Sequence, residues 1–407
     1  MLNSSRIIKR RLIQLLLFIA TFIAATISGG EWRFGQFLAY PRTVSFAEIF
    51  SEGLNFSIPF LLALTVHEFG HYFTARFNRL DVSLPYYIPL YFYVMPSIGT
   101  MGAFIRIREK IKSRRVIFDV GLAGPLAGFA VAIGVLYYGF ANLPPASYVY
   151  EIHPDYHIWG ENYEVVYSLD TVIYKKDLGH LDPAILEKLP DEIHYRSEGI
   201  FKLGSNLIFE FFKKYVADPE RVPNPYEIIH YPWLFAGFLA LFFTAINLIP
   251  IGQLDGGHVL FGLIGYKNHK TVSSALFIGF VFYTGLGLVT FQDMNDELFL
   301  GLPAYLSKPG LYTLYLYMAF YSLSSQPMVR LIAALSVFLA QLLLALTIPG
   351  ISGNEVWLLF ALIIGRFLGI HHPPVVENKP LDWKRKVLGW IAVIVFVLSF
   401  SPKVFTV

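Results

Sequence analysis

Long stretches of apolar residues, separated by short polar turns, dominate the pattern along this chain. A helix that crosses a bilayer needs about 20 mostly apolar residues, and several runs approach or exceed this length. We therefore predict an all-α polytopic membrane protein with about nine transmembrane helices. The predicted spans are residues 12–28, 55–77, 117–140, 233–264, 272–291, 311–325, 328–347, 355–370 and 387–402.

One of these segments, residues 233–264, is too long for a single straight helix. Pro250, Gly252, Gly256 and Gly257 interrupt it near its middle. A helix that breaks at membrane depth is tolerated only where protein or a water-filled cavity surrounds the exposed backbone. The sequence thus predicts a broken helix inside the bundle.

Residues 103–108 depart from the helical pattern, because apolar and basic residues alternate there. A period of two residues is typical of a strand. Gly99 and Gly102 stand upstream as turn residues, so we predict a small β-hairpin.

The only stretch with soluble-like composition is residues 142–231, an insert rich in Tyr, Asp and Glu. Near its end, residues 207–216 place phenylalanines opposite Lys213 and Lys214. We predict an amphipathic helix there, with Ser205 as its N-cap, lying in the membrane interface.

Composition supports a membrane location. Hydrophobic residues make up 55% of the chain and charged residues 15%, against about 25% charged residues in soluble domains. This composition excludes a disordered or an ordinary soluble protein. A net charge of +3 is too weak to indicate nucleic-acid binding, and the lack of cysteine excludes disulfide and thiol chemistry.

Lysine and arginine collect in a few loops, which predicts orientation because such loops stay on the cytoplasmic side. We expect the N-terminal apolar run to be a retained helix and the N-terminus to face the cytoplasm, in the inner membrane of a bacterial cell. The insert and an acidic loop with Asp293, Asp296 and Glu297 then face outward. The basic stretches are residues 6–11, 106–115, 267–270 and 384–386.

The sequence HEFGH stands at residues 67–71 within a predicted span. Residues four apart share one face of a helix, so His67 and His71 can converge on one metal ion, with Glu68 beside it to handle a water. Two interior histidines that hydrogen-bond across the bundle are the alternative. Ionisable residues inside a membrane span are costly, however, and are functional candidates by default.

Asp255 is the candidate for a third ligand, because an unpaired carboxylate is unfavourable in the apolar stretch around it. Pairing with a lysine or capping of a helix would also account for it. His258 follows three residues later, as a support for the ligands or as an ordinary interface histidine.

HEFGH in one span and NLIPIGQLDGG at residues 247–257 in another, in this order, resemble the site-2 protease family of intramembrane zinc metalloproteases. Between them, GLAGPLAG at residues 121–128 resembles the third core helix of that family, although small residues allow close helix packing in any membrane bundle. With no evident PDZ domain, the chain looks most like the PDZ-free branch.

The resemblance implies that His67, His71 and Asp255 bind Zn²⁺ and that Glu68 is the catalytic general base. It also implies that Asn247 and Pro250 shape the place where a substrate is unwound. The implied division is an N-terminal helix and loop (1–54), two parts of a catalytic core (55–141 and 232–271), the extracytoplasmic insert (142–231) and C-terminal helices (272–407).

We therefore predict a zinc metalloendopeptidase that cleaves transmembrane segments of membrane proteins, an activity known as regulated intramembrane proteolysis. The strand near Phe104 and Ile105 is expected to bind the unwound substrate by edge pairing, and the product is expected to be released into the cytoplasm. The alternative is a membrane metal transporter that uses the same His/Glu/Asp cluster.

Two other histidine pairs are interpreted without a metal. His371 and His372 precede Pro373 in a polar stretch that we predict to be a solvated loop. His153 and His157 have helical spacing, but Pro154 between them argues against a helix and therefore against a shared metal.

Overall fold

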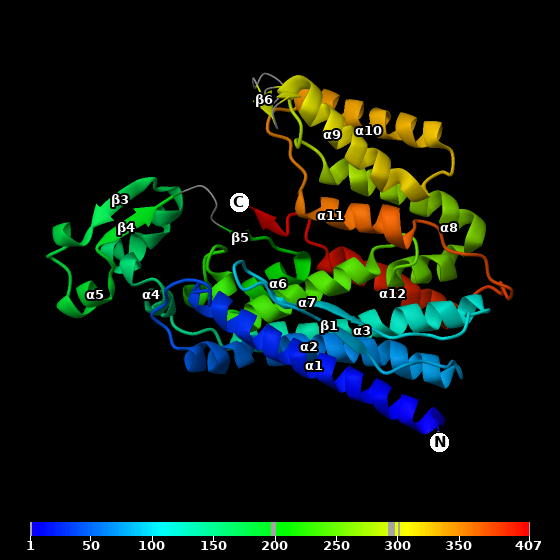
Figure 1. Ribbon diagram of the computed structural model, residues 1–407, viewed down its shortest axis with the longest axis horizontal. Helices are drawn as coiled ribbons and strands as arrows, with labels where there is room; N and C mark the ends of the chain where they lie inside the picture. The colour runs from blue at the N-terminus through cyan, green and yellow to red at the C-terminus, as the bar shows by residue number, and fades with distance from the viewer. Residues whose placement is uncertain (1, 197–200, 292–297, 300–301, 407) are drawn as a thin grey trace.

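The computed structural model describes residues 2–196, 201–291, 298–299 and 302–406. Its helices pack into one large body, and a small lobe with α5, β3 and β4 lies beside one end of that body (Figure 1). The helices are α1 (Leu2–Phe34), α2 (Phe46–Phe77), α3 (Arg114–Ala141), α4 (Tyr148–Ile152), α5 (Pro183–Lys188), α6 (Leu207–Tyr215), α7 (Pro232–Leu248), α8 (Asp255–Thr284), α9 (Ala304–Ala319), α10 (Pro327–Thr347), α11 (Val356–Ile363) and α12 (Trp383–Ser399).

Four helices in the described part of the chain are long and apolar enough to cross a membrane. They lie in α1, α2, α3 and α10, and the shorter apolar helices α7 and α11 accompany them. The prediction of an integral membrane protein built mainly from helices is confirmed. The four long helices do not by themselves establish the predicted nine spans.

The start of α2 shows how local sequence sets a helix boundary. The side chain of Ser45 accepts a hydrogen bond from the backbone of Glu48, and the Glu48 side chain accepts one from the backbone of Ser45. This reciprocal capping box satisfies backbone groups that a helix start leaves unpaired. The helix therefore begins at Phe46, before the apolar stretch from which the span was predicted.

The predicted break in residues 233–264 is confirmed. Helix α7 ends at Leu248, the chain turns through residues 249–254, and α8 starts at Asp255. Helix α8 then kinks at Gly265, whose φ of 77° is accessible mainly to glycine. The kink frees the carbonyl of Gly262, and Arg114 donates hydrogen bonds of 3.1 and 2.9 Å to it.

The predicted β-hairpin exists, but its second strand lies earlier in the chain than predicted. Strand β1 (Tyr86–Leu90) pairs antiparallel with β2 (Gly99–Phe104). Of the predicted residues 105–108, only Ile107 forms a bridge, to Val82. The alternation of apolar and basic side chains indicated an extended backbone at residues 103–108. Pairing with β1, however, ends at Phe104.

The insert forms two structures. Residues from 148 to 196 build the lobe around their own apolar cluster, with the antiparallel strands β3 (Thr171–Tyr174) and β4 (Glu192–Tyr195). The later part returns to the helical body, where β5 (Lys202–Leu203) pairs with β8 (Phe405–Thr406). A further short hairpin joins β6 (Leu298–Phe299) and β7 (Leu302–Pro303).

The predicted amphipathic helix is α6, with one correction. Its N-cap is Asn206, whose side chain accepts a hydrogen bond from the Phe209 backbone at 3.0 Å, so the prediction of Ser205 was wrong by one residue. Phe209 and Phe212 are buried and pack on Phe140 of α3. The apolar face of α6 is therefore covered by protein at this position.

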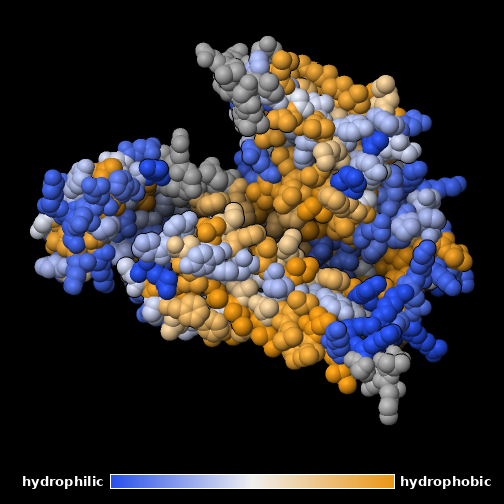
Figure 2. Space-filling view, in the orientation of Figure 1, coloured by the Kyte–Doolittle hydropathy of each residue, from blue (hydrophilic) through white to orange (hydrophobic). Residues whose placement is uncertain are grey.

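Hydrophilic residues gather near the N-terminus and over the lobe, while hydrophobic residues dominate much of the face between them (Figure 2). Residues in or next to two of the predicted basic stretches are in contact, because Arg115 donates to the carbonyl of Pro380 and Arg385 pairs with Asp119 at 2.7 Å. The acidic residues Asp293, Asp296 and Glu297 lie outside the described residues.

Candidate metal centre

Two histidines of α2 present their ring nitrogens to the same point. The Nε2 atoms of His67 and His71 lie 3.0 Å apart, one helical turn along a single face. Nδ1 of His71 lies 2.8 Å from the backbone carbonyl of Val120 in α3. Because a carbonyl only accepts, Nδ1 carries the proton and the Nε2 lone pair of His71 faces His67.

Two glycines of α3 make room for these rings. A Cβ atom on Gly124 would overlap the imidazole of His71, and one on Gly128 would lie 3.0 Å from Cβ of His67. In contrast, a Cβ on Gly134 of the same helix would meet nothing within 4 Å. The small residues at 121–128 thus allow close helix packing, as predicted, and that packing places the imidazoles.

The broken helix delivers the third side chain. Asp255 stands at the first residue of α8, and its Oδ2 lies 3.1 Å from Nε2 of His71 and 3.5 Å from Nε2 of His67. The turn before it is fixed by Ser273, which accepts a hydrogen bond from Gly252 and donates one to the carbonyl of Ile370. Residues that the sequence separates by more than 180 positions are thereby brought together.

The three ligand atoms fit a tetrahedral metal ion. Their separations of 3.0, 3.1 and 3.5 Å bracket the edge of about 3.3 Å that follows from metal–ligand bonds of about 2.0–2.1 Å. Two imidazole nitrogens and one carboxylate oxygen are a donor set that suits zinc and leave a fourth position open. His67, His71 and Asp255 are therefore a candidate metal site.

Glu68 is buried beside this site and takes no part in the metal-binding group. The backbone of Ile105, just after β2, hydrogen-bonds its carboxylate. The helix thus directs both histidines to the ion and leaves a carboxylate available for proton transfer next to it.

A cavity of about 1020 Å³ opens onto His67, Glu68, His71 and Asp255. It is also lined by residues 101–105 of the hairpin region, including the predicted substrate-binding residues Phe104 and Ile105. Phe104 is 48% exposed and stacks on Tyr86 of β1. Among the described residues β2 pairs on one side only, with β1, so that its other edge, beside the cavity, has no strand partner there.

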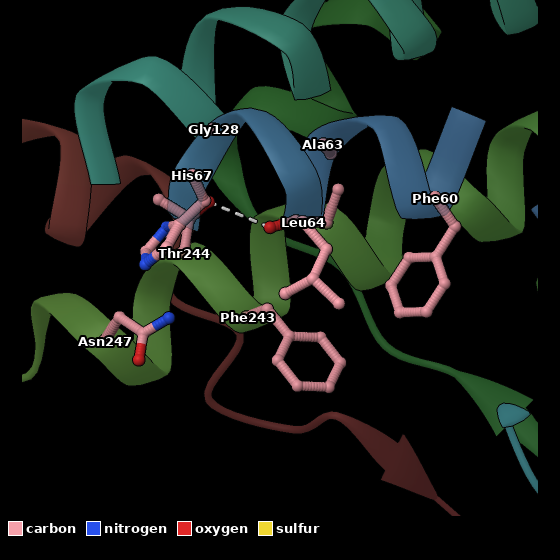
Figure 3. A pocket seen from close by; sticks show the side chains of 9 residues that line it. Phe60, Ala63, Leu64, His67, Gly128, Phe243, Thr244 and Asn247 are labelled. Atoms are coloured by element: carbon pink, nitrogen blue, oxygen red, sulfur yellow. Dashed lines mark hydrogen bonds between the residues drawn. The ribbon is translucent and has the colours of Figure 1, made fainter. Parts of the chain in front are cut away.

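A second, much smaller cavity of about 20 Å³ lies behind His67. His67 of α2 and Thr244 and Asn247 of α7 lie around it, with Phe60 and Phe243 farther along (Figure 3). Asn247 lines both this cavity and the large one. Pro250 lies in the turn after α7 and lines neither cavity.

The prediction of a solvated loop at His371 and His372 was wrong for His372, which is 3% exposed. Its ring stacks on Phe261 of α8, and its Nε2 lies 3.1 Å from Nδ1 of His258. Residues 372–376 line the large cavity. The paired histidines before Pro373 were a visible signal, but nothing in the sequence showed that this segment folds back onto α8.

His153 and His157 were interpreted without a metal, because Pro154 between them argued against a helix. His153 lies beside Glu227 and His230 instead, and these three side chains form a second candidate metal group in the described part of the chain. The sequence separates His153 from the other two by more than 70 residues, so helical spacing could not reveal this cluster.

Comparison with known proteins agrees with this geometry. The profile of Peptidase family M50 matches residues 55–288, which contain HEFGH and Asp255. The chain is 28% identical over 227 residues to a protein of Oryza sativa subsp. indica named "Probable zinc metalloprotease EGY2, chloroplastic" and 26% identical over 228 residues to its Arabidopsis thaliana counterpart. Each match covers 56% of this chain and 32% of the relative. No solved structure matches the chain.

Proposed function

This chain belongs to peptidase family M50, and from that premise we propose that it is an intramembrane zinc metallopeptidase that cleaves membrane-spanning segments of other proteins. The observation that carries the proposal is the convergence of His67, His71 and Asp255 on one point, with Glu68 beside them, at the wall of a large cavity between apolar helices.

We assign His67, His71 and Asp255 as the zinc ligands. A zinc ion held there would supply Lewis-acid chemistry, which polarises a carbonyl and makes water a better nucleophile near neutral pH. The carbonyl of Val120 keeps the proton on Nδ1 of His71, so that Nε2 remains a ligand. The protein supplies this arrangement before substrate arrives, because three packed helices hold it.

Glu68 is the general base in this proposal. Its carboxylate accepts a proton from the attacking water and then donates it to the amide nitrogen of the leaving chain. The hydrogen bond from the backbone of Ile105 holds the carboxylate on the cavity side of α2. Burial of Glu68 away from bulk solvent leaves the carboxylate few competing proton donors.

The hairpin and α7 are proposed to receive the substrate. A spanning helix has its backbone groups paired internally, so it must unwind before a peptide bond can reach the site. The edge of β2 offers backbone partners to the unwound segment, with Phe104 and Ile105 beside it and Asn247 opposite. Pro250 acts through the turn that sets Asp255.

The orientation is also a proposal. The contacts between residues 114–119 and 377–386 place two basic stretches at one end of the bundle, and basic loops remain cytoplasmic. With that end inside, the helices α7, α8, α9, α11 and α12 bring the number of spans to about nine, and the lobe faces the opposite side. The cut then releases a fragment into the cytoplasm.

A single-span protein with different tags at its two ends, reconstituted in vesicles with the purified enzyme, tests the function. We expect cleavage by the native chain, a loss of at least about 100-fold in Glu68→Gln and unchanged zinc content in that variant. Glu52→Gln, in the same helix but remote from the site, is the matched control. Native-rate cleavage by Glu68→Gln would refute the assignment.

The transporter alternative is separated by the same preparation. A transporter would carry zinc into sealed vesicles without cutting any tagged protein. The family match and the single base beside the ligands favour hydrolysis. Zinc uptake that survives in Glu68→Gln, with no cleavage by the native chain, would favour transport instead.

A further inference from the structure

A second cluster of histidine and carboxylate side chains lies where the lobe joins the helical body. His153 belongs to the lobe, whereas Glu227 and His230 lie in the chain that leads into α7. Nε2 of His153 is 3.3 Å from Nε2 of His230 and 3.5 Å from Oε2 of Glu227, and the third side of this triangle is 3.8 Å. Shifts of a few tenths of an ångström would bring all three edges to the tetrahedral value of about 3.3 Å.

The two carboxylate oxygens of Glu227 differ in their hydrogen-bond partners. Oε1 accepts hydrogen bonds from the hydroxyls of Tyr156 and Tyr167, at 2.9 and 2.6 Å. Oε2 is fully buried and has no hydrogen-bond partner among the described residues, and it faces the two imidazoles. A buried carboxylate oxygen left in this state is unfavourable unless a cation balances it.

The two tyrosines hold one oxygen of Glu227 and leave the other to the imidazoles. Both phenols donate to Oε1, and supporting hydrogen bonds of this kind fix the orientation of a ligating carboxylate. The site thus offers Oε2 to an ion, while Oε1 is already occupied.

His230 is oriented as a ligand. Its Nδ1 lies 2.8 and 3.2 Å from the carbonyls of Trp32 and Arg33, at the end of α1. Carbonyls only accept, so Nδ1 carries the proton and Nε2 presents its lone pair to the cluster.

The guanidinium of Arg33 lies 3.9 Å over the ring of Tyr148, and among the described residues no ion pair joins it to Glu227. The side chain of His153 is 30% exposed, so the cluster has an open side through which an ion can enter.

We propose that His153, Glu227 and His230 bind a divalent transition-metal ion, with zinc as the ion that the donor set fits best. Its ligands come from two segments of the chain, His153 from the lobe and Glu227 with His230 from the residues before α7. Its role is structural: the ion would tie the lobe to α7 directly and to α1 through His230. The proposal does not depend on the proposed peptidase activity.

Zinc content of the purified full chain in detergent, measured after saturation with Zn²⁺ and removal of excess metal by gel filtration, tests this site. We expect His153→Ala to hold one zinc equivalent less than the native chain. His157→Ala removes an exposed imidazole of the same segment and should retain the native content. Glu227→Gln, which keeps an acceptor for both tyrosines, should lose the same equivalent as His153→Ala.

The outcome is independent of the intramembrane site. Asp255→Ala should still retain the equivalent that His153→Ala loses, and a double variant should retain neither. If the intramembrane site binds no zinc, the native chain holds one equivalent and His153→Ala none, and the proposal stands. Equal zinc content in the native chain and in His153→Ala, with both eluting as the same folded species, would overturn it.

Discussion

The molecule contains two clusters with the same chemical donors, two histidines and one carboxylate, placed in different surroundings. In the membrane cluster, His67 and His71 come from one helix and Asp255 from the start of another. In the junction cluster, formed by His153, Glu227 and His230, the first ligand comes from the lobe and the other two lie three residues apart before α7. The ligand atoms are nearly equally close in both, at 3.0–3.5 Å and 3.3–3.8 Å.

The two clusters differ in the cavity and the polar groups that surround their ligands. The membrane cluster opens onto a cavity of about 1020 Å³ and has Glu68 beside it. At the junction, the neighbouring polar groups are tyrosines that already donate to Glu227. Donor type alone therefore identifies where an ion can bind. Whether that ion can take part in hydrolysis depends on a nearby general base that does not bind the ion and on a cavity that can hold a peptide.

The largest expected effect comes from removing the carboxylate ligand of each cluster in turn. Asp255→Ala should reduce cleavage of a tagged substrate at least about 1000-fold, because the zinc ligand set is broken. Glu227→Gln should leave the cleavage rate within about threefold of native, since that side chain is remote from the scissile bond. Cleavage rates in proteoliposomes, with zinc content measured in parallel, check both. A loss in Glu227→Gln as large as that in Asp255→Ala would remove the distinction between the clusters.

The next effect tests whether α3 positions the imidazoles. Gly124→Ala places a methyl group against the ring of His71, and displacement of a reacting group by about 1 Å can cost about 100-fold in rate. We expect a loss of that order together with reduced zinc content at the membrane cluster. Gly134→Ala adds the same methyl group to the same helix where nothing lies within 4 Å, and it should be nearly silent. Similar rates for the two variants would show that close packing at Gly124 is unimportant.

The two clusters also show how much of a site can be predicted from the sequence. The HEFGH spacing fixed one face of a helix, and Asp255 stood out because its neighbours are apolar, so the membrane cluster was predictable. The junction cluster was not, because its residues have no local period and meet only through the packing of the lobe against α1 and α7. For the same reason the burial of His372 was missed. Helix lengths were also uncertain, since a cap such as Ser45 and a kink such as Gly265 decide them locally.

A smaller effect is expected at the substrate side of the membrane cluster. Phe104→Ala removes an aromatic side chain that lines the large cavity and leaves the three ligands and the base intact. We expect KM for a single-span substrate to rise about three- to tenfold, the cost of about 1 kcal/mol of lost apolar contact, with kcat nearly unchanged. Phe92→Ala, an exposed aromatic on the same hairpin that does not line the cavity, is the control. A lowered kcat without a change in KM would place Phe104 in the chemistry instead.

The last effect, which should leave cleavage unchanged, separates the ligands of the junction cluster from their support. Tyr167→Phe removes the 2.6 Å hydrogen bond to Oε1 of Glu227 while Tyr156 still donates to that oxygen, and loss of such a supporting bond lowers metal affinity about tenfold. Tyr163→Phe, whose ring stacks on Tyr156, is the matched control. Zinc titration of the Asp255→Ala background, in which only the junction can bind, should resolve the difference. Equal zinc affinities in the two phenylalanine variants would mean that the hydrogen bond from Tyr167 to Glu227 does not affect zinc binding. A tenfold loss of affinity confined to Tyr167→Phe, without any change in cleavage by the otherwise native enzyme, would support different roles for the two clusters. One chain would then use the same three donors for structure in one place and for chemistry in the other.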